Sequence, residues 1–545
     1  MLLLALWGVR SAHAQSPSPA DATFLSTLGE LREASFPDKE AIVERLSQSG
    51  HPSVRVVLSA LMDDRLFYRN AEKPEDQKIV IARTVEGSPE VIDLIDPVTL
   101  KAAGTAPADS LTSINTNNRL RSVLKTTVAH FSLASPDVQV RMDAVHDMME
   151  SPDEAAIALL KERNAVETSS KVKKEIAVAL ALVDLNNSDA QVRLAAIKTL
   201  EISTSQDVRN KLAGLLEKDS DGKFAESDDN VRAAAAHAML IIDRWRTFYS
   251  GIETLFFGLS LGSVLVLIAI GLAITFGVMG VINMAHGELM MLGAYTTYVV
   301  QTIMPGHIAI SILVAIPAAF IVSALTGIVI ERTIIRFLYG RPLETLLATF
   351  GVSLILQQLV RSIFSALNKS VVTPEWMSGS MQINDALSIT YNRLYIVIFT
   401  LLVFAAIMAV LKRTRLGLDI RAVSQNRSMA RAMGIRSEWV DAMTFGLGSG
   451  IAGVAGVALS QLTNVGPNLG QSYIIDSFMV VVFGGVGNLW GALIGGMSMG
   501  IVNKLLEPYA GAVLAKIFIL IALILFIQAR PRGLFPQSGR SSGDN

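Results

Sequence analysis

The sequence contains no cysteine among its 545 residues. This excludes disulfides, thiolate nucleophiles, iron–sulfur clusters and cysteine-based zinc sites. The phosphate-binding pattern G-x-x-x-x-G-K-S/T is also missing, so the chain has no standard ATP site of its own. Charged residues make up only 17% of the chain, and no basic segment is interleaved with aromatic residues as in nucleic-acid binders. We therefore expect no catalytic residue, no cofactor, no metal and no nucleic-acid partner.

The chain does contain two halves of different composition. Residues 1–250 carry 29 Lys and Arg against 36 Asp and Glu, whereas residues 251–545 carry 18 against 12. The whole chain is 51% hydrophobic with a mean hydropathy of +0.44. Residues 254–287 contain no charged side chain, a run too long for one membrane span of about 20 residues. An acidic soluble half followed by a membrane half is therefore predicted.

The first residues resemble a secretory signal peptide. Leu2 to Val9 form a short apolar core, although no basic residue precedes it, and Ala12-His13-Ala14 fits the small-x-small cleavage pattern. We interpret residues 1–14 as a signal peptide and residues 15–246 as an exported domain.

The exported domain has the periodicity of helices and a weak internal repeat. Three segments share a polar N-cap, then Val-Arg, then Ala three residues after the arginine. They are SPDVQVRMDAVHDMM (135–149), NSDAQVRLAAIKTL (187–200) and SDDNVRAAAAHAML (227–240). This pattern resembles HEAT repeats, in which helix pairs stack on one another and the arginine can cap a helix or pair with an acid of a neighbouring repeat. A generic all-α domain is the alternative.

The second half is predicted to be a polytopic helical domain of about eight spans, so the fold class is all-α throughout. Apolar runs follow the first span and its break near 277–283, at 284–303, 307–330, 342–366, 392–411, 437–462, 474–506 and 511–529. Segment 474–506 is either one long span or two short helices broken at glycines. Thirteen of the 18 basic residues fall after spans three, five and the last, which places these loops in the cytoplasm and the first half outside.

Polar groups interrupt the apolar runs at two places. In INMAHGELMMLGAY, Asn283, His286 and Glu288 lie within six residues, and Gln358 lies on a later span. In VVFGGVGNLWGALIGG, Gly484, Gly485, Gly487 and Asn488 lie together. Polar groups inside spans are costly and usually mark pathways or interhelical contacts.

A basic amphipathic segment lies between two spans. DIRAVSQNRSMARAMGI, residues 419–435, places Val423, Asn426, Ala430 and Met433 on one helical face, with Arg421 at its start. Arg427 and Arg431 fall on another face, and Gly434 favours a helix end. Such a helix could dock on a cytoplasmic partner or be an ordinary basic loop.

These three motifs, in this order, resemble the branched-chain amino acid permease family of ABC importers over residues 251–535. The extra exported domain and the Trp490 form of the second motif resemble the urea-transporter branch of that family. The resemblance implies a permease domain at 247–535, a disordered cytoplasmic tail at 536–545 and a place in a bacterial inner membrane. It also implies a second homologous permease subunit, two cytoplasmic ATPase subunits and an exported solute-binding protein as partners.

Under this resemblance, the polar residues of the two motifs and Gln358 are candidates for a substrate pathway, and segment 421–434 is a candidate ATPase-coupling helix. A neutral solute such as urea or a short amide loses its water on entry and needs replacement donors and acceptors. Packing between helices is the alternative role for the same side chains. A branched-chain amino acid permease, a passive urea channel and a membrane-anchored HEAT scaffold are the alternative functions.

Overall fold

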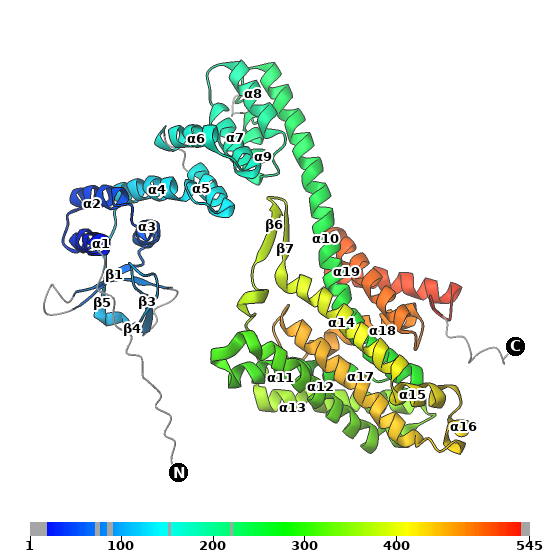
Figure 1. Cartoon of the computed structure of the whole chain (residues 1–545). Helices are drawn as coiled ribbons and strands as arrows, with labels where there is room; N and C mark the ends of the chain where they lie inside the picture. Colours follow the sequence, from blue (N-terminus) through cyan, green and yellow to red (C-terminus); the bar gives the residue numbers. More distant parts are fainter. Residues whose placement is uncertain (1–18, 71–76, 84–90, 151–153, 219–221, 536–545) are drawn as a thin grey trace, which may run out of the picture. The chain divides into compact units, whose positions relative to one another are not determined.

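The computed structural model describes residues 19–70, 77–83, 91–150, 154–218 and 222–535 (Figure 1). The chain forms two compact units that divide between Ile242 and Asp243, inside the long helix α10 (Asp229–Met279). The predicted signal peptide and the predicted tail lie outside the described residues.

The first unit begins with three helices around an apolar core. These are α1 (Pro19–Gly29), α2 (Phe36–Gln48) and α3 (Val54–Met62). Fully buried Leu28, Leu46 and Leu58 belong to one cluster of this core. The unit continues as helices α4 (Asn118–Leu133), α5 (Val138–Glu150), α6 (Glu154–Val166), α7 (Ser170–Asp184), α8 (Ala190–Leu200) and α9 (Gln206–Leu215).

Between α3 and α4 lies an antiparallel sheet that the sequence did not predict. Its strands are β1 (Leu66–Arg69), β2 (Ile79–Ala82), β3 (Val91–Ile95), β4 (Ala102–Pro107) and β5 (Leu111–Ser113), in the order β4-β3-β2-β1-β5. Each has six residues or fewer, and β2 is buried along its whole length, so no period-2 alternation marks it. The predominantly helical fold class is confirmed, with this sheet as an addition to the first half.

Two of the three repeated arginines of the first unit, Arg141 and Arg193, make matching contacts, whereas Arg232 pairs with Asp229 of its own helix. Arg141 on α5 donates two hydrogen bonds to Glu167 and two to the carbonyl oxygens of Ser135 and Pro136. Arg193 on α8 likewise donates two to Glu226 and two to carbonyl oxygens five and six residues before it. In both cases the arginine ties its own helix to an acid that follows the next helix, Glu167 after α6 and Glu226 after α9.

The Glu167 carboxylate is held in its charged form. Burial by itself would raise its pKa, but hydrogen bonds from the Ser169 backbone N–H and from two guanidinium groups lower the pKa to about 2. A carboxyl with a lowered pKa stabilises the fold above its ordinary pKa. This contribution is therefore lost only as the pH falls from about 4.5 toward 2.

The second unit is a helical bundle. After α10 come α11 (His286–Ile303), α12 (Ile308–Thr333), α13 (Pro342–Phe364), α14 (Tyr391–Arg413), α15 (Arg415–Gln425), α16 (Arg427–Ala432), α17 (Ser437–Ser460), α18 (Leu469–Gly484) and α19 (Leu489–Ala529). A short hairpin, β6 (Ser380–Asn384) and β7 (Leu387–Thr390), joins α13 to α14.

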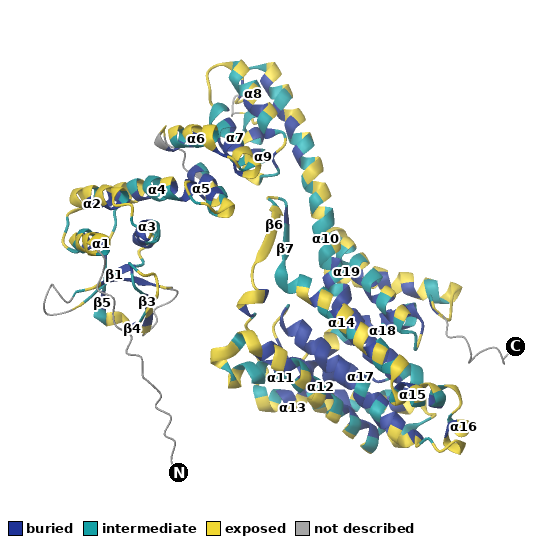
Figure 2. Cartoon of the chain, in the orientation of Figure 1, coloured by how far each residue is buried: buried dark blue, intermediate teal, exposed yellow. Residues whose placement is uncertain are grey.

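Six helices of the described residues are long and apolar enough to cross a membrane: α10, α13, α14, α17, α19 and α12 with the short turn that precedes it. Figure 2 shows α17 largely buried, whereas α13 and α14 alternate between buried and exposed residues. Helix α17 therefore forms the centre of the bundle, and the outer helices present apolar side chains of the kind that lipid covers.

Helix α19 reverses direction, which decides the span pattern of segment 474–506. Its backbone leaves helical geometry at Gly511, where φ is +77°, three residues after Pro508. Asn488 at its start donates to the carbonyl oxygen of Phe535, beyond its end, at 3.3 Å. Segment 474–506 is thus two helices broken at 485–488. The helical segments between Arg436 and Arg530 are α17, α18 and the two parts of α19.

Candidate functional site

Glycine residues let the central helices of the second unit approach backbone to backbone. A β-carbon at Gly293 of α11 would collide with the backbone of Gly453 of α17, and one at Gly456 would collide with the carbonyl of Met290. Gly287 meets Gly470 at the start of α18 in the same way. Small residues at these positions therefore let the spans pack at close range.

The break between α10 and α11 carries the first predicted site. Gly280 has φ of +65° and ends α10, and His286 is the first residue of α11. The Oδ1 atom of Asn283 accepts a hydrogen bond from the Ala285 N–H at 3.0 Å. The Met284 N–H donates to Thr349 Oγ1 on α13 at 3.1 Å. The segment between α10 and α11 is thus held by one local hydrogen bond at the start of α11 and by one hydrogen bond to α13.

His286 and Glu288 are both buried on α11, but they point to different neighbouring helices and do not pair with each other. The His286 Nε2 atom lies 3.1 Å from the carbonyl oxygen of Ile268, so Nε2 carries the proton and donates. The Glu288 Oε1 atom accepts from Ser353 Oγ at 3.0 Å and from Gln357 Nε2 at 2.8 Å. The histidine therefore bonds to α10 and the glutamate to α13.

Gln357, rather than the predicted pathway residue Gln358, reaches this cluster. The side chains of Ser353 and Gln357 lie one turn apart on the buried face of α13. Gln358 follows on the exposed face. The two glutamines are adjacent in the sequence, and only the rotation of α13 about its axis decides that Gln357 rather than Gln358 faces α11.

Three polar atoms of the break have no hydrogen-bond partner among the described residues. These are Nδ2 of Asn283, Nδ1 of His286 and Oε2 of Glu288, and each belongs to a side chain that is at most 1% exposed. A buried polar atom without a partner costs about 1–3 kcal/mol. Donor and acceptor capacity is therefore left over at this point of the bundle.

The second predicted site lies elsewhere. Gly485 and Gly487 have φ of +101° and +79° and form the turn between α18 and α19, and Asn488 caps α19 by accepting from the Trp490 and Gly491 N–H groups. Gly484 packs against Gly491, so these glycines serve close packing of α18 on α19.

A pocket of about 300 Å³ adjoins this turn and places it at the cationic end of the bundle. Lys412, Arg421, Gly277, Gly487 and Asn488 are among the residues that line it. At this turn Gly487 packs against Gly277, near the end of α10 that leads into the break, whereas Glu288 bonds to Ser353 and Gln357 of α13.

The predicted coupling segment forms two short helices rather than one. Asn426 has extended backbone geometry between α15 and α16, and its side chain accepts from the Met429 N–H to cap α16. Gly434 has φ of +86°, and the Ile435 N–H reaches back to the Ala430 carbonyl at 3.0 Å, so the glycine ends α16 as predicted.

The two faces of the coupling segment differ from the prediction. Val423 and Ala430 are buried in a cluster with Ile420 and Val440, whereas Met433 is 78% exposed. Arg421 is exposed and donates to the carbonyl of Leu411. The predicted apolar face is thus divided, with two members facing the bundle and Met433 facing away.

Arg427 and Arg431 hold α16 to the bundle. Arg427 donates two hydrogen bonds, of 2.8 and 2.9 Å, to the buried carboxylate of Asp441 on α17, and its guanidinium lies 4.8 Å from the Tyr339 ring centroid. Arg431 Nε donates to Ser437 Oγ at 2.6 Å. These two side chains position α16, since they are engaged within the chain.

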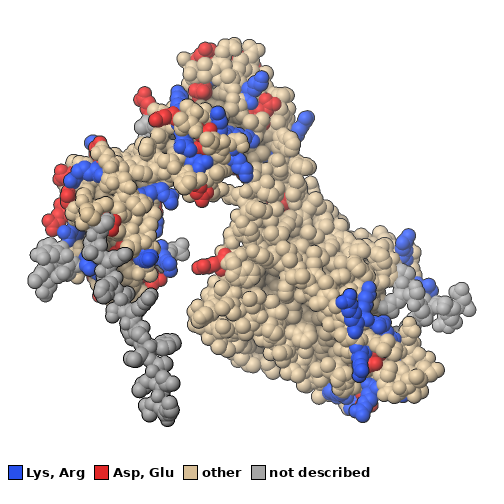
Figure 3. Space-filling view, viewed as in Figure 1, with Lys and Arg blue, Asp and Glu red and all other residues tan. Residues whose placement is uncertain are grey.

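The basic loops of the second unit gather at one end of it. Arg336, from the loop after α12, pairs with Glu438 of α17 at 3.1 Å, beside the Arg427–Asp441 pair. Figure 3 shows Lys and Arg concentrated around α15 and α16, with almost none over the helical surface above them. This gathering is what the charge pattern of a membrane protein predicts.

Comparison with known proteins identifies relatives of the second half. The family described as branched-chain amino acid transport system / permease component matches residues 254–527. The high-affinity branched-chain amino acid transport system permease protein BraD of Pseudomonas aeruginosa is 31% identical over 295 residues, which are 52% of this chain and 96% of BraD. LivH of Escherichia coli, a permease protein of the same description, is 32% identical over 294 residues, 52% of this chain and 94% of LivH.

A more distant relative transports a different solute. The ribose import permease protein RbsC of Escherichia coli is 26% identical over 289 residues, 50% of this chain and 85% of RbsC. No solved structure matches the chain.

The glycine contacts predict a severe effect of one methyl group. Gly293→Ala should destabilise the bundle by about 3 kcal/mol, the upper end of the cost of overpacking, because the added carbon meets backbone that cannot rotate away. The apparent melting temperature of the purified full chain measures this.

The matched control is Gly351→Ala on α13, where a β-carbon would meet nothing within 4 Å. This change should leave the melting temperature unchanged or raise it, since alanine favours a helix over glycine by about 1 kcal/mol. Equal melting temperatures for the two variants would contradict the role of Gly293.

Proposed function

The chain belongs to the family of branched-chain amino acid transport permeases, and on this basis we propose that it is the membrane subunit of an ABC importer for urea or another short amide. Relatives of known function are transport permease subunits, so the chain is a transport subunit rather than an enzyme. The observation that carries the proposal is the set of unpartnered polar atoms on Asn283, His286 and Glu288, buried at a helix break in a membrane bundle.

The chemistry of the break suits a neutral, hydrated solute. Urea offers N–H donors and a carbonyl acceptor, and it must exchange its water hydrogen bonds for protein ones to enter the membrane. The free Oε2 of Glu288 accepts from an N–H group, and the Nδ2 of Asn283 donates to a carbonyl. His286 Nδ1 is an acceptor, because Nε2 carries the proton. Discontinuous helices that expose such groups are the usual binding element of transporters.

The substrate assignment rests on the first unit. The family match covers residues 254–527 and so leaves out the 242 residues before the division between the units. That additional unit is the feature that resembles the urea branch, and its arginine–glutamate contacts support HEAT-like stacking. Branched-chain amino acid import is the second candidate, and it is favoured by the printed names of BraD and LivH.

The direction of the chain in the membrane follows from the basic end of the bundle. The cationic loops around α15 and α16 face the cytoplasm, and the first unit then lies on the outer side, where an exported solute-binding protein delivers the solute. A second homologous permease completes the membrane part. Two ATPase subunits bind the cytoplasmic face, since this chain has no ATP site.

Movement of the ATPases reaches the solute site through contacts within the chain. The exposed side of α16, with Met429 and Met433, is the docking surface. The Arg427–Asp441 pair connects α16 rigidly to α17. Helix α17 contacts α11 at glycines, and α11 carries His286 and Glu288. A displacement of α16 is thereby transmitted to the break, and transport requires that the solute bind the two resulting states differently.

The experiment that tests the proposal is uptake into vesicles that contain this chain with its second permease, its ATPases and its binding protein. ATP-dependent entry of radiolabelled urea is expected, without competition by excess leucine. Leucine entry without urea entry would overturn the urea assignment and leave the amino acid permease. Urea entry that continues without the ATPases would identify a passive channel. A scaffold would be identified if deletion of residues 21–245 abolishes transport while exchange of the spans for other spans does not.

Two neighbouring glutamines test the solute site. Gln357→Ala removes the donor to Glu288 and should lower uptake about tenfold, the effect of about 1.4 kcal/mol on a barrier, at unchanged protein abundance. Gln358→Ala, one position along α13 on the exposed face, should leave uptake as it is. If the Gln357 variant loses abundance and uptake in parallel, its role is packing.

The docking surface is tested with two exposed methionines. Met433→Asp places a charge where an ATPase would bury an apolar side chain, and burial of that side chain contributes about 1.5–3 kcal/mol to binding. Co-purification of the ATPases should therefore weaken about tenfold or more. Met381→Asp on β6 is the same change at another exposed methionine and should have no effect. Equal co-purification in both variants argues against docking at α16.

A further inference from the structure

Two adjoining pockets share one side chain at the end of the bundle opposite the basic loops. Gln461 directly follows α17, whose other end begins next to Arg436. It lines an apolar pocket of about 190 Å³ between α12, α14 and α17. It also lines a second pocket of about 400 Å³, formed by Val371 and residues 460–464. The chemistry of the surface changes from apolar to polar at this residue.

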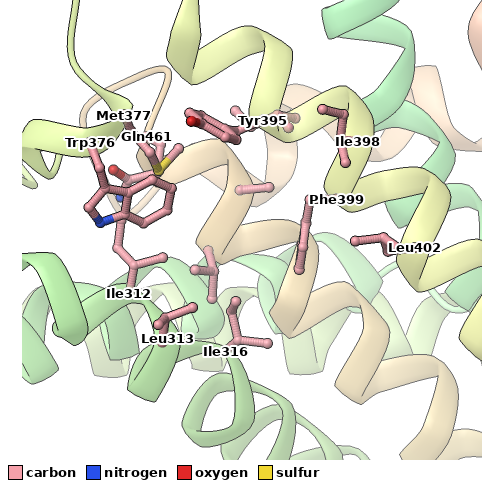
Figure 4. Close-up of a pocket in the computed structure, with 13 residues that line it drawn as sticks. Ile312, Leu313, Ile316, Trp376, Met377, Tyr395, Ile398, Phe399, Leu402 and Gln461 are labelled. Atoms are coloured by element: carbon pink, nitrogen blue, oxygen red, sulfur yellow. The ribbon is translucent and has the colours of Figure 1, made fainter.

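The apolar pocket has the form of a slot that opens between spans. Figure 4 shows Ile312 and Ile316 of α12 on one side and Ile398 and Leu402 of α14 on the other. Val457 and Ala458 of α17 are buried and close the slot from within. Apart from Gln461 and the polar tips of Trp376 and Tyr395, its lining is apolar, with the Met377 thioether among hydrocarbon side chains.

Aromatic side chains mark the upper edge of the slot. The Trp376 and Tyr395 rings lie edge to face with centroids 5.3 Å apart, and Trp376 Nε1 donates to the carbonyl of Ala309 at 3.1 Å. Both residues are partly exposed. Tryptophan and tyrosine are typical of the boundary between hydrocarbon and lipid head groups, so the slot lies below this boundary and the polar pocket lies at it.

Gln461 has an acceptor without a partner at the point where the pockets meet. Its side chain is 6% exposed, and its Nε2 atom donates to Ser460 Oγ at 3.2 Å, whereas Oε1 has no partner among the described residues. The second pocket adds the hydroxyl of Thr463 and the amide of Asn464. The surface thus offers an apolar slot, then an acceptor without a partner, then a polar pocket. This order fits an amphipathic molecule whose head group donates a hydrogen bond.

We propose that these pockets form a specific lipid site that holds one acyl chain of a phospholipid in the slot and a donor-bearing head group, such as that of phosphatidylethanolamine, at Gln461. The ammonium group donates to Gln461 Oε1, and the Thr463 hydroxyl and the Asn464 amide offer donors to the phosphate and ester oxygens. The acyl chain separates α12 from α14 at the slot and so fixes the outer half of the bundle. The inference is independent of the solute that the permease moves.

The test is native mass spectrometry of the purified full chain, first delipidated and then loaded with phosphatidylethanolamine or with phosphatidylcholine, whose head group has no N–H donor. The wild-type chain is expected to keep one phosphatidylethanolamine under conditions that remove phosphatidylcholine. Gln461→Leu should reduce the retained phosphatidylethanolamine about three- to tenfold, the effect of one hydrogen bond, and abolish the preference between the lipids.

A second pair of variants tests the slot itself. Leu313→Trp at its mouth, where the leucine is 60% exposed, should fill it and remove the retained lipid. Leu354→Trp on α13, where the leucine is 50% exposed and outside the pocket, is the matched control and should keep it. The proposal is overturned if the wild-type chain retains neither lipid, if both lipids are kept equally, or if the two tryptophan variants behave alike. It is also overturned if a cross-linker at position 402 captures the second permease subunit instead of lipid.

Discussion

Contact between glycine backbones is the interaction on which the membrane unit depends. Inside a bilayer, lipid tails are as apolar as leucine, so helices gain little from burying large apolar side chains against each other. When two helices approach closely, dispersion contacts form between their backbones instead. The central helix α17 approaches α11 in this way at Gly453 and Gly456. Because both contacts involve main-chain atoms, they fix the distance between these helices more tightly than side-chain packing could.

This rigid centre is what allows polar groups to remain buried at the helix break. Glu288 receives two hydrogen bonds from α13, and His286 donates one to α10, yet an atom of each is left without a partner. A looser bundle would relax until those atoms found partners or water. Polar atoms left unpaired inside spans usually mark a pathway or a contact between helices.

The same centre connects the basic end of the unit to the break. Two hydrogen bonds join Arg427 of α16 to the buried carboxylate of Asp441 on α17. Buried pairs of this kind contribute less to stability than to geometry, because desolvation offsets much of their attraction. Its value here lies in holding a six-residue helix, too short to be stable alone, at a fixed place on the membrane unit.

The sequence by itself determined the class of this protein, the division into two units, the positions of most spans and the Gly434 helix end. These follow from composition, charge distribution, apolar run length and local glycine chemistry, which act over one helix at a time. Tertiary structure alone decided that Gln357 rather than Gln358 meets Glu288, that Arg427 faces Asp441, and that the Gly484–Asn488 turn lies at the basic end. It also decided that short segments between α3 and α4 pair as a sheet. Each of these depends on the phase or register of one segment against a distant one, and a single sequence carries no local signal for that relation.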